Sequence, residues 1–200
     1  MQRQIFGRRA TRSTFLGFLT TLATAAVLVA VPQSAQAAST WTKCLPKADV
    51  PGFTPVFTDD SQVYTGPAPA PTGKVVYAGL WDAVTDAYDG AQLNTLHFTK
   101  GGEDDEPSDN WAWLNFDGNA ITFYYRTEPG AGAFNVYMDG QWFFDLGQSS
   151  YDGGRYYKSI TFCENANGSR RHKIGLHSRN QFEYAYNTNV DAFLTHQFTY

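Results

Sequence analysis

The sequence is poor in the residues and motifs on which many small enzymes depend. It holds two cysteines and four histidines in 200 residues. The histidines form neither an H-E-x-x-H motif nor the spacing of a zinc site. No G-x-S-x-G nucleophile elbow and no phosphate-binding loop is found. From these absences we expect that the protein is not an enzyme.

Positive charge is also scarce. The chain has 15 Lys and Arg against 19 Asp and Glu. Four of the arginines lie in residues 1–37, where there is no acid, so residues 38–200 carry a formal charge of −8. The one basic run, residues 170–173, is too short to reverse this sign and is interpreted as a solvated strand end. An acidic domain without a basic cluster predicts no nucleic-acid partner and no membrane partner.

Long apolar stretches are missing except for one near the start, at about residues 15–31. It is short for a membrane span. Arginines precede it, and the small-x-small sequence Ala35-Gln36-Ala37 follows it. This order is that of a secretory signal peptide over residues 1–37, in a style typical of bacteria. We therefore expect a secreted, extracellular protein, in which Cys44 and Cys163 form a disulfide bond.

Proline is unevenly distributed. Six of the nine prolines fall between residues 46 and 71, and residues 66–71 alternate proline with glycine or alanine. Such a segment is stiff and extended. Residues 38–73 are predicted to be a Pro-rich N-terminal arm, with one or two short strands in residues 50–64 and a link to the domain through Cys44. Residues 74–200 are predicted to form one domain.

No window of useful length in this domain has the 3.6-residue period of a helix; apolar residues instead alternate with a period of two. Turn residues recur at the spacing typical of β-sandwiches. Asp139-Gly140 between two alternating segments predicts a two-residue hairpin. We therefore predict an all-β, antiparallel β-sandwich, with Phe134, Val136 and Met138 in the core. Strict alternation after the turn places Trp142 and Phe144 on one face and Phe143 on the other.

An ordered set of short motifs resembles the galactose-binding-like, jelly-roll carbohydrate-binding modules. It runs through residues 76–81 (VYAGLW), 88–90 (YDG), His97, 114–121 (LNFDGNAI), 134–140 (FNVYMDG), 172–176 (HKIGL) and 190–193 (VDAF). The resemblance implies a polysaccharide or cell-wall glycan as partner. It also implies a structural calcium site at Asp191, although the acidic segment that completes such a site is not evident before Val75.

Aromatic residues are the expected means of glycan binding, since flat rings meet the apolar faces of sugars while polar groups bind the hydroxyls. The candidates with loop positions are Trp81, Tyr88, Trp111, Trp142 and Tyr151, with Asn115, Asn135 and Asp152 as polar partners. Trp111 and Trp113 share one strand face, which favours a core position for at least one of them. The function predicted from the sequence is that of a secreted, lectin-like, non-catalytic carbohydrate-binding protein.

Two other functions remain open at this point. One is a small glycoside hydrolase or esterase on a jelly roll, which needs two carboxylates across a cleft; Glu128, Asp139, Asp145 and Glu183 are available. The other is a protein-binding module, such as an inhibitor or an adhesin. The acidic loop at residues 103–109 has oxygen ligands that suit calcium, but a solvated loop is favoured.

Overall fold

The computed structural model describes residues 41–85, 91–99, 110–165, 170–179 and 188–199, all of which belong to one compact unit, Ala37–Tyr200. Among them no helix is long and apolar enough to cross a membrane. The predicted signal peptide, Tyr88, the acidic loop at 103–109 and Glu183 lie outside the described residues.

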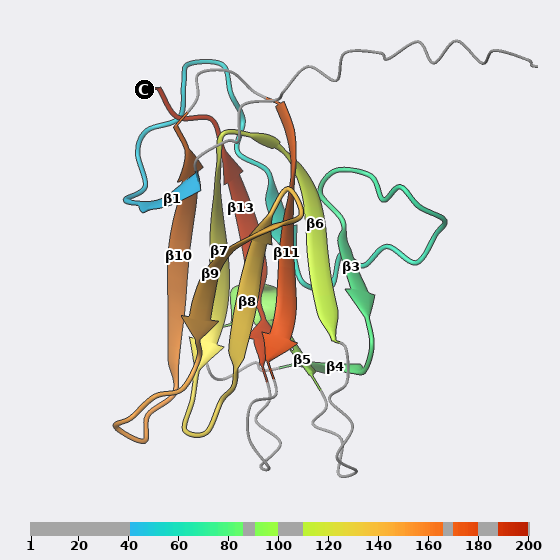
Figure 1. Cartoon of the computed structure of the whole chain (residues 1–200), viewed down its shortest axis with the longest axis vertical. Coiled ribbons are helices and arrows are strands. Elements are labelled where there is room, and N and C mark those ends of the chain that lie inside the picture. Colours follow the sequence, from blue (N-terminus) through green and yellow to red (C-terminus); the bar gives the residue numbers. More distant parts are fainter. Residues whose placement is uncertain (1–40, 86–90, 100–109, 166–169, 180–187, 200) are drawn as a thin grey trace, which may run out of the picture. The chain divides into compact units, whose positions relative to one another are not determined.

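Two five-stranded antiparallel sheets form the fold (Figure 1). The front sheet has the order β3 (Val75–Ala78), β6 (Trp111–Gly118), β11 (Arg170–Arg179), β8 (Ala133–Met138) and β9 (Gln141–Gly147). The back sheet has the order β1 (Trp41–Cys44), β10 (Tyr156–Glu164), β7 (Ala120–Thr127), β13 (Ala192–His196) and β2 (Phe57–Asp59). A small sheet joins β12 (Asn189–Val190), β5 (Thr95–Thr99) and β4 (Trp81–Thr85), and the short 3-10 helix η1 (Gln92–Asn94) precedes β5.

The apolar side chains of the two large sheets share one core. Leu114, Phe134 and Ile174 enter it from the front sheet, and Phe123 and Phe162 from the back sheet, all without exposed area. Burying a ring or branched aliphatic side chain of this size contributes about 1.5–3 kcal/mol. The predicted all-β, antiparallel β-sandwich is therefore confirmed.

The alternation predicted from the sequence is clear in the front sheet. Phe134, Val136 and Met138 are buried as predicted, while Asn135 and Tyr137 between them are partly exposed. Asp139 and Gly140 both have positive φ, 53° and 81°, so the predicted hairpin turn between β8 and β9 is confirmed.

Beyond this turn the prediction for the three aromatic residues is wrong. The pairing of β8 with β9 shifts between Val136 and Tyr137, so that Trp142 pairs with Tyr137 and Phe144 with Val136. A β-bulge of this kind places one additional residue in one strand and breaks the alternation. Trp142 is 61% exposed, whereas Phe143 and Phe144 both pack against the core.

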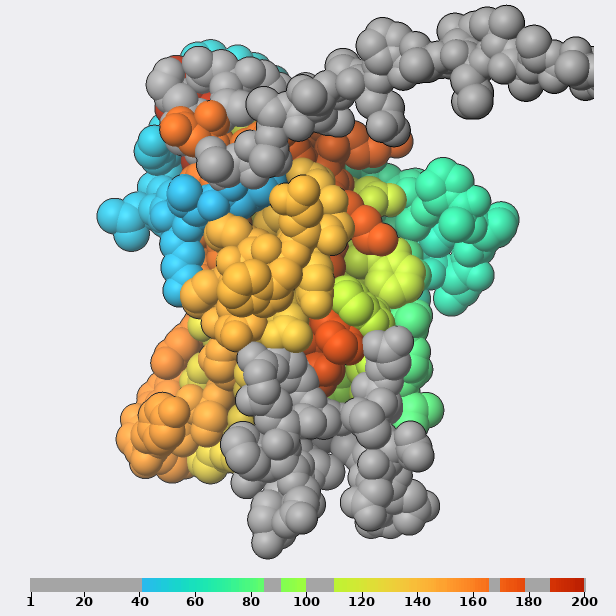
Figure 2. All heavy atoms as spheres, in the orientation of Figure 1, coloured from blue at the N-terminus to red at the C-terminus, as the bar shows by residue number. Residues whose placement is uncertain are grey.

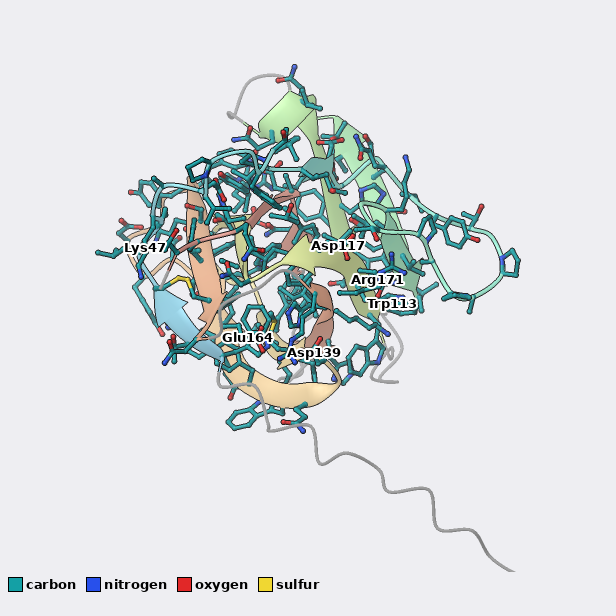
Figure 3. All side chains as sticks on the ribbon, turned by 90° about the horizontal axis from the view of Figure 1, so that it is seen from above. Lys47, Trp113, Asp117, Asp139, Glu164 and Arg171 are labelled. Carbon is teal, nitrogen blue, oxygen red and sulfur yellow. A yellow bond between two sulfur atoms is a disulfide. The ribbon has the colours of Figure 1, made fainter. Side chains whose placement is uncertain are left out.

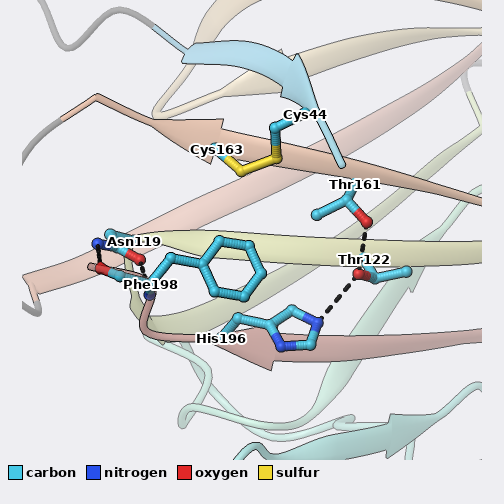
Figure 4. The surroundings of a disulfide bond; sticks show 7 residues. All are labelled: Cys44, Asn119, Thr122, Thr161, Cys163, His196 and Phe198. Atoms are coloured by element: carbon cyan, nitrogen blue, oxygen red, sulfur yellow. Dashed lines mark hydrogen bonds between the residues drawn. A yellow bond between two sulfur atoms is a disulfide. The ribbon is translucent and has the colours of Figure 1, made fainter. Parts of the chain in front are cut away.

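The segment predicted as an arm contributes to the sandwich itself. Its strands β1 and β2 are the two edge strands of the back sheet. Cys44 at the end of β1 forms the predicted disulfide with Cys163 of β10 (Figure 4). Residues 41–73 therefore complete this sheet at both of its edges.

Candidate functional site: an aromatic sheet face

The outer side of the front sheet carries a row of aromatic residues that runs across the strands. Gly175 of β11 pairs with Trp113 of β6 on one side and with Tyr137 of β8 on the other. Tyr137 in turn pairs with Trp142 of β9. Their strand neighbours Leu114, Val136 and Ile174 point into the core, so period-two geometry turns these residues outward.

A second row lies beside the first. In it His177 of β11 pairs with Trp111 of β6 and with Asn135 of β8, and Asn135 pairs with Asp145 of β9. We call the surface formed by Trp111, Trp113, Tyr137 and Trp142 the aromatic face. Figure 2 views the molecule from this side, with β6 in yellow-green and β8 in yellow.

The rings of this face contact one another and the adjacent cationic and imidazole groups. Trp111 stacks on His177 with ring centroids 4.3 Å apart and lies 5.1 Å from Tyr137. The Lys173 ammonium group is 4.9 Å from the Trp113 ring centre. The Trp142 indole nitrogen donates a hydrogen bond of 3.1 Å to Asp145. These contacts fix the orientation of each ring and reduce the entropy lost when a ligand is bound.

The composition of the face suits a ligand with flat apolar surfaces and a polar rim. Rings offer apolar area, while amide, carboxylate and ammonium groups can bind hydroxyl groups. Polar residues lie on both sides of the rings: Asn135 and Asp145 toward one end of the strands, and Asn115, Asp117, Arg171 and Lys173 toward the other. Asn115 also donates a hydrogen bond to the Ala70 carbonyl and so attaches the Pro-rich segment to β6.

The structure brings together four of the residues predicted to bind ligand: Trp111, Trp142, Asn115 and Asn135. The prediction that Trp111 or Trp113 lies in the core is wrong, because both are partly exposed on the outer side of β6. Trp113, Tyr137 and His177 were missed as site residues. The alternation in the sequence showed that each of these residues lies on the opposite side of its strand from the apolar residues next to it. It did not show which strands pair, and therefore did not show that the three residues lie side by side.

Three other predicted ligand residues, Trp81, Tyr151 and Asp152, lie elsewhere. Trp81 is partly buried, stacks on Phe134 and donates a hydrogen bond from its indole nitrogen to the Ala78 carbonyl. Tyr151 is fully exposed in the connection between β9 and β10. In the same connection Asp152 accepts hydrogen bonds from the Gly154 backbone and the Tyr156 hydroxyl. These interactions stabilise the turn and lower the pKa of Asp152.

The described carboxylates considered for hydrolysis all have structural partners. Glu128 lies 3.1 Å from Arg126 and 3.4 Å from Arg155. Asp139 lies 2.8 Å from the His172 ring. Burial raises the pKa of Asp139, but hydrogen bonds from His172 and from the Lys173 backbone outweigh burial and leave it below the usual value. These contacts do not identify any two of these carboxylates as the catalytic pair of a glycoside hydrolase.

Three buried carboxylates meet at the edge of the small sheet. Asp59, Asp60 and Asp191 are each at most 1% exposed. Asp60 lies 2.7 Å from His97, and Asp191 accepts a hydrogen bond from the Gln92 backbone. Desolvation, together with the charges of Asp60 and Asp59, raises the pKa of Asp191 to about 7. Asp59 and Asp60, which precede Val75, are thus the acidic residues that lie beside Asp191.

This acidic cluster does not have the arrangement of a metal site. Among the described residues, no group of three or more His, Cys, Asp or Glu side chains is placed to hold a metal ion. Thr95 hydrogen-bonds to both Asp59 and Asp60, which occupies oxygen atoms that a cation would need. Calcium at Asp191 therefore remains a prediction.

A further polar chain lies on the outer side of the back sheet (Figure 4). The Thr122 hydroxyl is 3.0 Å from His196 Nε2, and His196 Nδ1 is 3.2 Å from Asp49. This order resembles a hydrolase triad. However, Thr122 is 3% exposed and its hydroxyl is also 2.8 Å from that of Thr161. The chain therefore satisfies buried polar groups and joins the segment at Asp49 to the sheet.

Comparison with known proteins gives matches in structure alone. No family model and no curated protein matches the sequence. The catalytic domain of a glycoside hydrolase family 87 α-1,3-glucanase, in complex with nigerose, is similar with a TM-score of 0.44 and 10% identity. The match covers 73% of this chain and 28% of that one.

Two other solved structures are similar to a comparable degree. A family 43 arabinoxylan arabinofuranohydrolase from Bacillus subtilis, in complex with cellotetraose, has a TM-score of 0.43 and 13% identity over 70% of this chain and 27% of that one. A family 35 carbohydrate-binding module from Clostridium thermocellum has a TM-score of 0.36 and 9% identity over 71% of this chain and 97% of that one. The chain thus spans about a quarter of the length of the hydrolase chains.

These comparisons correct one expectation from the sequence, that the protein is not an enzyme. Several of the similar structures are glycoside hydrolases, among them catalytic domains, so the expectation does not stand. The motifs missing from the sequence belong to other enzyme classes. Glycoside hydrolases instead use two carboxylates brought together by the fold, an arrangement with no short sequence signature.

Proposed function

We propose that the protein binds a polysaccharide on the aromatic face of its front sheet and that it does so outside the cell. The observation that carries the proposal is the register of Trp113, Tyr137 and Trp142, which places three outward rings on one line across neighbouring strands. The carbohydrate-related names of the similar structures agree with it. The extracellular location is supported by the signal-peptide pattern and the Cys44–Cys163 disulfide.

The physical basis is contact between rings and sugar faces. Each partly exposed ring has apolar area that water solvates poorly, and a sugar ring covers that area with its C–H groups. The hydroxyl groups around the sugar then find polar partners at both borders of the face, including Asn135 and Lys173. A single sugar makes few such contacts, whereas a polymer makes them repeatedly and gains affinity from their number.

The test is retention of the protein on insoluble glucan, xylan and chitin, together with binding to soluble oligosaccharides by calorimetry. We expect Trp113→Ala and Tyr137→Ala each to weaken binding about tenfold, equivalent to about 1.4 kcal/mol. Tyr151→Ala is the matched control, because Tyr151 is an exposed aromatic residue away from this face, and it should bind as the wild type does.

Reducing-sugar release by the wild type on the same polysaccharides is measured in parallel, so that hydrolysis and binding are scored separately. The proposal is wrong if the folded wild type binds no glycan in either format. It is also wrong if Tyr151→Ala, rather than the face variants, abolishes binding.

A further inference from the structure

Gly175 occupies a position where a strand does not need glycine. It lies within β11, the central strand of the front sheet, with β6 and β8 paired on its two sides. Its φ is outside the left-handed region, so its backbone would accept any residue. Glycine inside a strand weakens it by up to about 1 kcal/mol and often marks a close approach of a ligand or another backbone.

The side chains of Trp111 and Tyr137 lie over Gly175. A Cβ atom at this position would lie 3.6 Å from the Tyr137 Cβ and 3.7 Å from the Trp111 Cζ3, which are ordinary van der Waals contacts. An alanine therefore fits without displacement. A branched side chain would extend further and press on the rings of Trp111 and Tyr137. Gly175 is itself buried beneath these two rings, whose centroids are 5.1 Å apart, so glycine lets the rings lie close to the strand.

The aromatic row has a direction and a length. Trp113 and Tyr137 are two strands apart with Gly175 between them, and neighbouring strands are about 4.8 Å apart, so the two residues are separated by roughly 10 Å. Trp142 lies one strand further, which makes the row about 15 Å long. A row of this length matches several sugars of an extended chain better than one sugar or a coiled chain.

We infer that the face takes an extended, ribbon-like glycan of equatorially linked sugars, which crosses the strands from Trp113 past Tyr137 to Trp142. This inference rests on the proposed function and adds to it the shape class of the ligand and the role of Gly175. Chains linked in this way stay straight and present ring faces along their length, whereas axially linked chains turn away from a flat surface. Gly175 is a positioning residue, because its missing side chain lets the rings of Trp111 and Tyr137 lie over the strand and contact each other.

The experiment compares oligosaccharides of two lengths and two linkages. Cellobiose, xylobiose and chitobiose are titrated into the full chain beside their hexamers, and maltohexaose serves as the axially linked probe. We expect the best hexamer to bind at least about tenfold more tightly than its dimer and than maltohexaose. Gly175→Val should weaken hexamer binding at least about tenfold, because its branches press on the rings of Trp111 and Tyr137 and displace them. Gly175→Ala should change it less than about threefold, since its Cβ is accommodated.

Trp142→Ala provides a second measurement that does not depend on how Gly175→Val folds. Removing the last ring of the row should reduce the ratio of the hexamer affinity to the dimer affinity about tenfold. Equal affinity for hexamer and dimer, tightest binding of maltohexaose, or wild-type affinity in folded Gly175→Val would each overturn the inference. In each of these three cases the proposed function still stands if the wild type binds polysaccharide and Trp113→Ala does not. A wild type that binds no glycan would instead refute the proposed function and this inference together.

Discussion

Glu164 of the back sheet and His172 of the front sheet meet inside the sandwich, with Glu164 Oε2 3.1 Å from His172 Nε2. Both side chains are 1% exposed. The other ring nitrogen of His172 lies 2.8 Å from Asp139, and the ring also contacts the indole of Trp41 edge-on at 4.9 Å. Figure 3 shows Glu164 and Asp139 close to each other. One imidazole therefore links two sheets and the β8–β9 turn.

Removing the Glu164 carboxylate should destabilise the protein strongly. Glu164→Ala leaves the buried His172 ring and the Arg170 guanidinium without this carboxylate, and breaking a buried pair of this kind costs about 3–5 kcal/mol. Glu164→Gln keeps the shape and should cost less. The exposed pair of Asp117 and Arg171, 3.6 Å apart, is the control, and Asp117→Ala should cost at most about 1 kcal/mol. Urea unfolding measures all three variants; a loss under about 1 kcal/mol for Glu164→Ala would contradict the expectation.

Stability should fall as the pH rises toward neutrality, because of Asp191. Its pKa is raised from 3.8 to about 7 in the folded protein, so folding favours the protonated form. The stabilisation is complete below about pH 4 and is lost as the pH rises through about 7, which amounts to as much as about 4 kcal/mol. Asp191→Asn mimics the protonated form and should flatten the pH dependence of the unfolding free energy between about pH 4 and pH 7.

Calcium provides the contrasting result at the same cluster. The pH series is repeated in EDTA and in excess calcium, with Asp117→Asn as a control that leaves the cluster intact. If calcium raises the unfolding temperature of the wild type above about pH 7 and fails to do so in Asp191→Asn, the cluster binds the cation. The series in EDTA tests the proton-based expectation, which is wrong if the wild type there loses no stability between about pH 4 and pH 7.

Local sequence patterns predicted the strands, but they did not predict which distant segments contact each other. The alternation of residues 134–138 and the Asp139-Gly140 turn gave the β8–β9 hairpin correctly. His172 shares parity with Ile174 and Leu176, so the local alternation is enough to place it on the core side of β11. Its partner Glu164, in contrast, comes from the other sheet, and nothing in the local pattern of either strand specifies that contact.

The candidate site shows the same division. Trp111 and Trp113 were placed on one face correctly, but alternation alone does not say which face is the core. That choice depends on the neighbouring strands β3 and β11, whose pairing with β6 joins distant segments. Likewise Asp59 and Asp60 join Asp191 only through the pairing of β2 with β13. These long-range contacts depend on the whole sandwich. The motif that contains Asp191 therefore gave no indication that Asp59 and Asp60 lie beside it.

The disulfide should contribute a large share of the net stability. Cys44 and Cys163 are 119 residues apart, and closing a loop of this length stabilises a folded chain by about 4–5 kcal/mol in the chain-entropy model. The Cys44→Ala/Cys163→Ala double variant should lose about that free energy of unfolding. A reducing agent should weaken the wild type to the same level and leave the double variant unchanged. Equal stability of oxidised wild type and double variant would contradict the expectation.

Two glycines with positive φ allow backbone strain to be separated from close contact. At Gly118, φ is 138° and a Cβ atom would lie 2.3 Å from the His196 carbonyl oxygen. That oxygen is held in place because it accepts a hydrogen bond of 3.0 Å from the Asn119 backbone. Gly118→Ala should therefore cost about 3 kcal/mol or more.

Gly140 is the matched control, since its φ is 81° and a Cβ atom there would meet nothing within 4 Å. Gly140→Ala has only the conformational cost of positive φ, about 1–2 kcal/mol. Denaturant unfolding of the two variants gives the difference directly. If both variants lose the same free energy of unfolding, a small backbone shift relieves the contact between the new Cβ atom and the His196 carbonyl. The connection between β6 and β7 is then less rigid than the hydrogen bond to Asn119 implies.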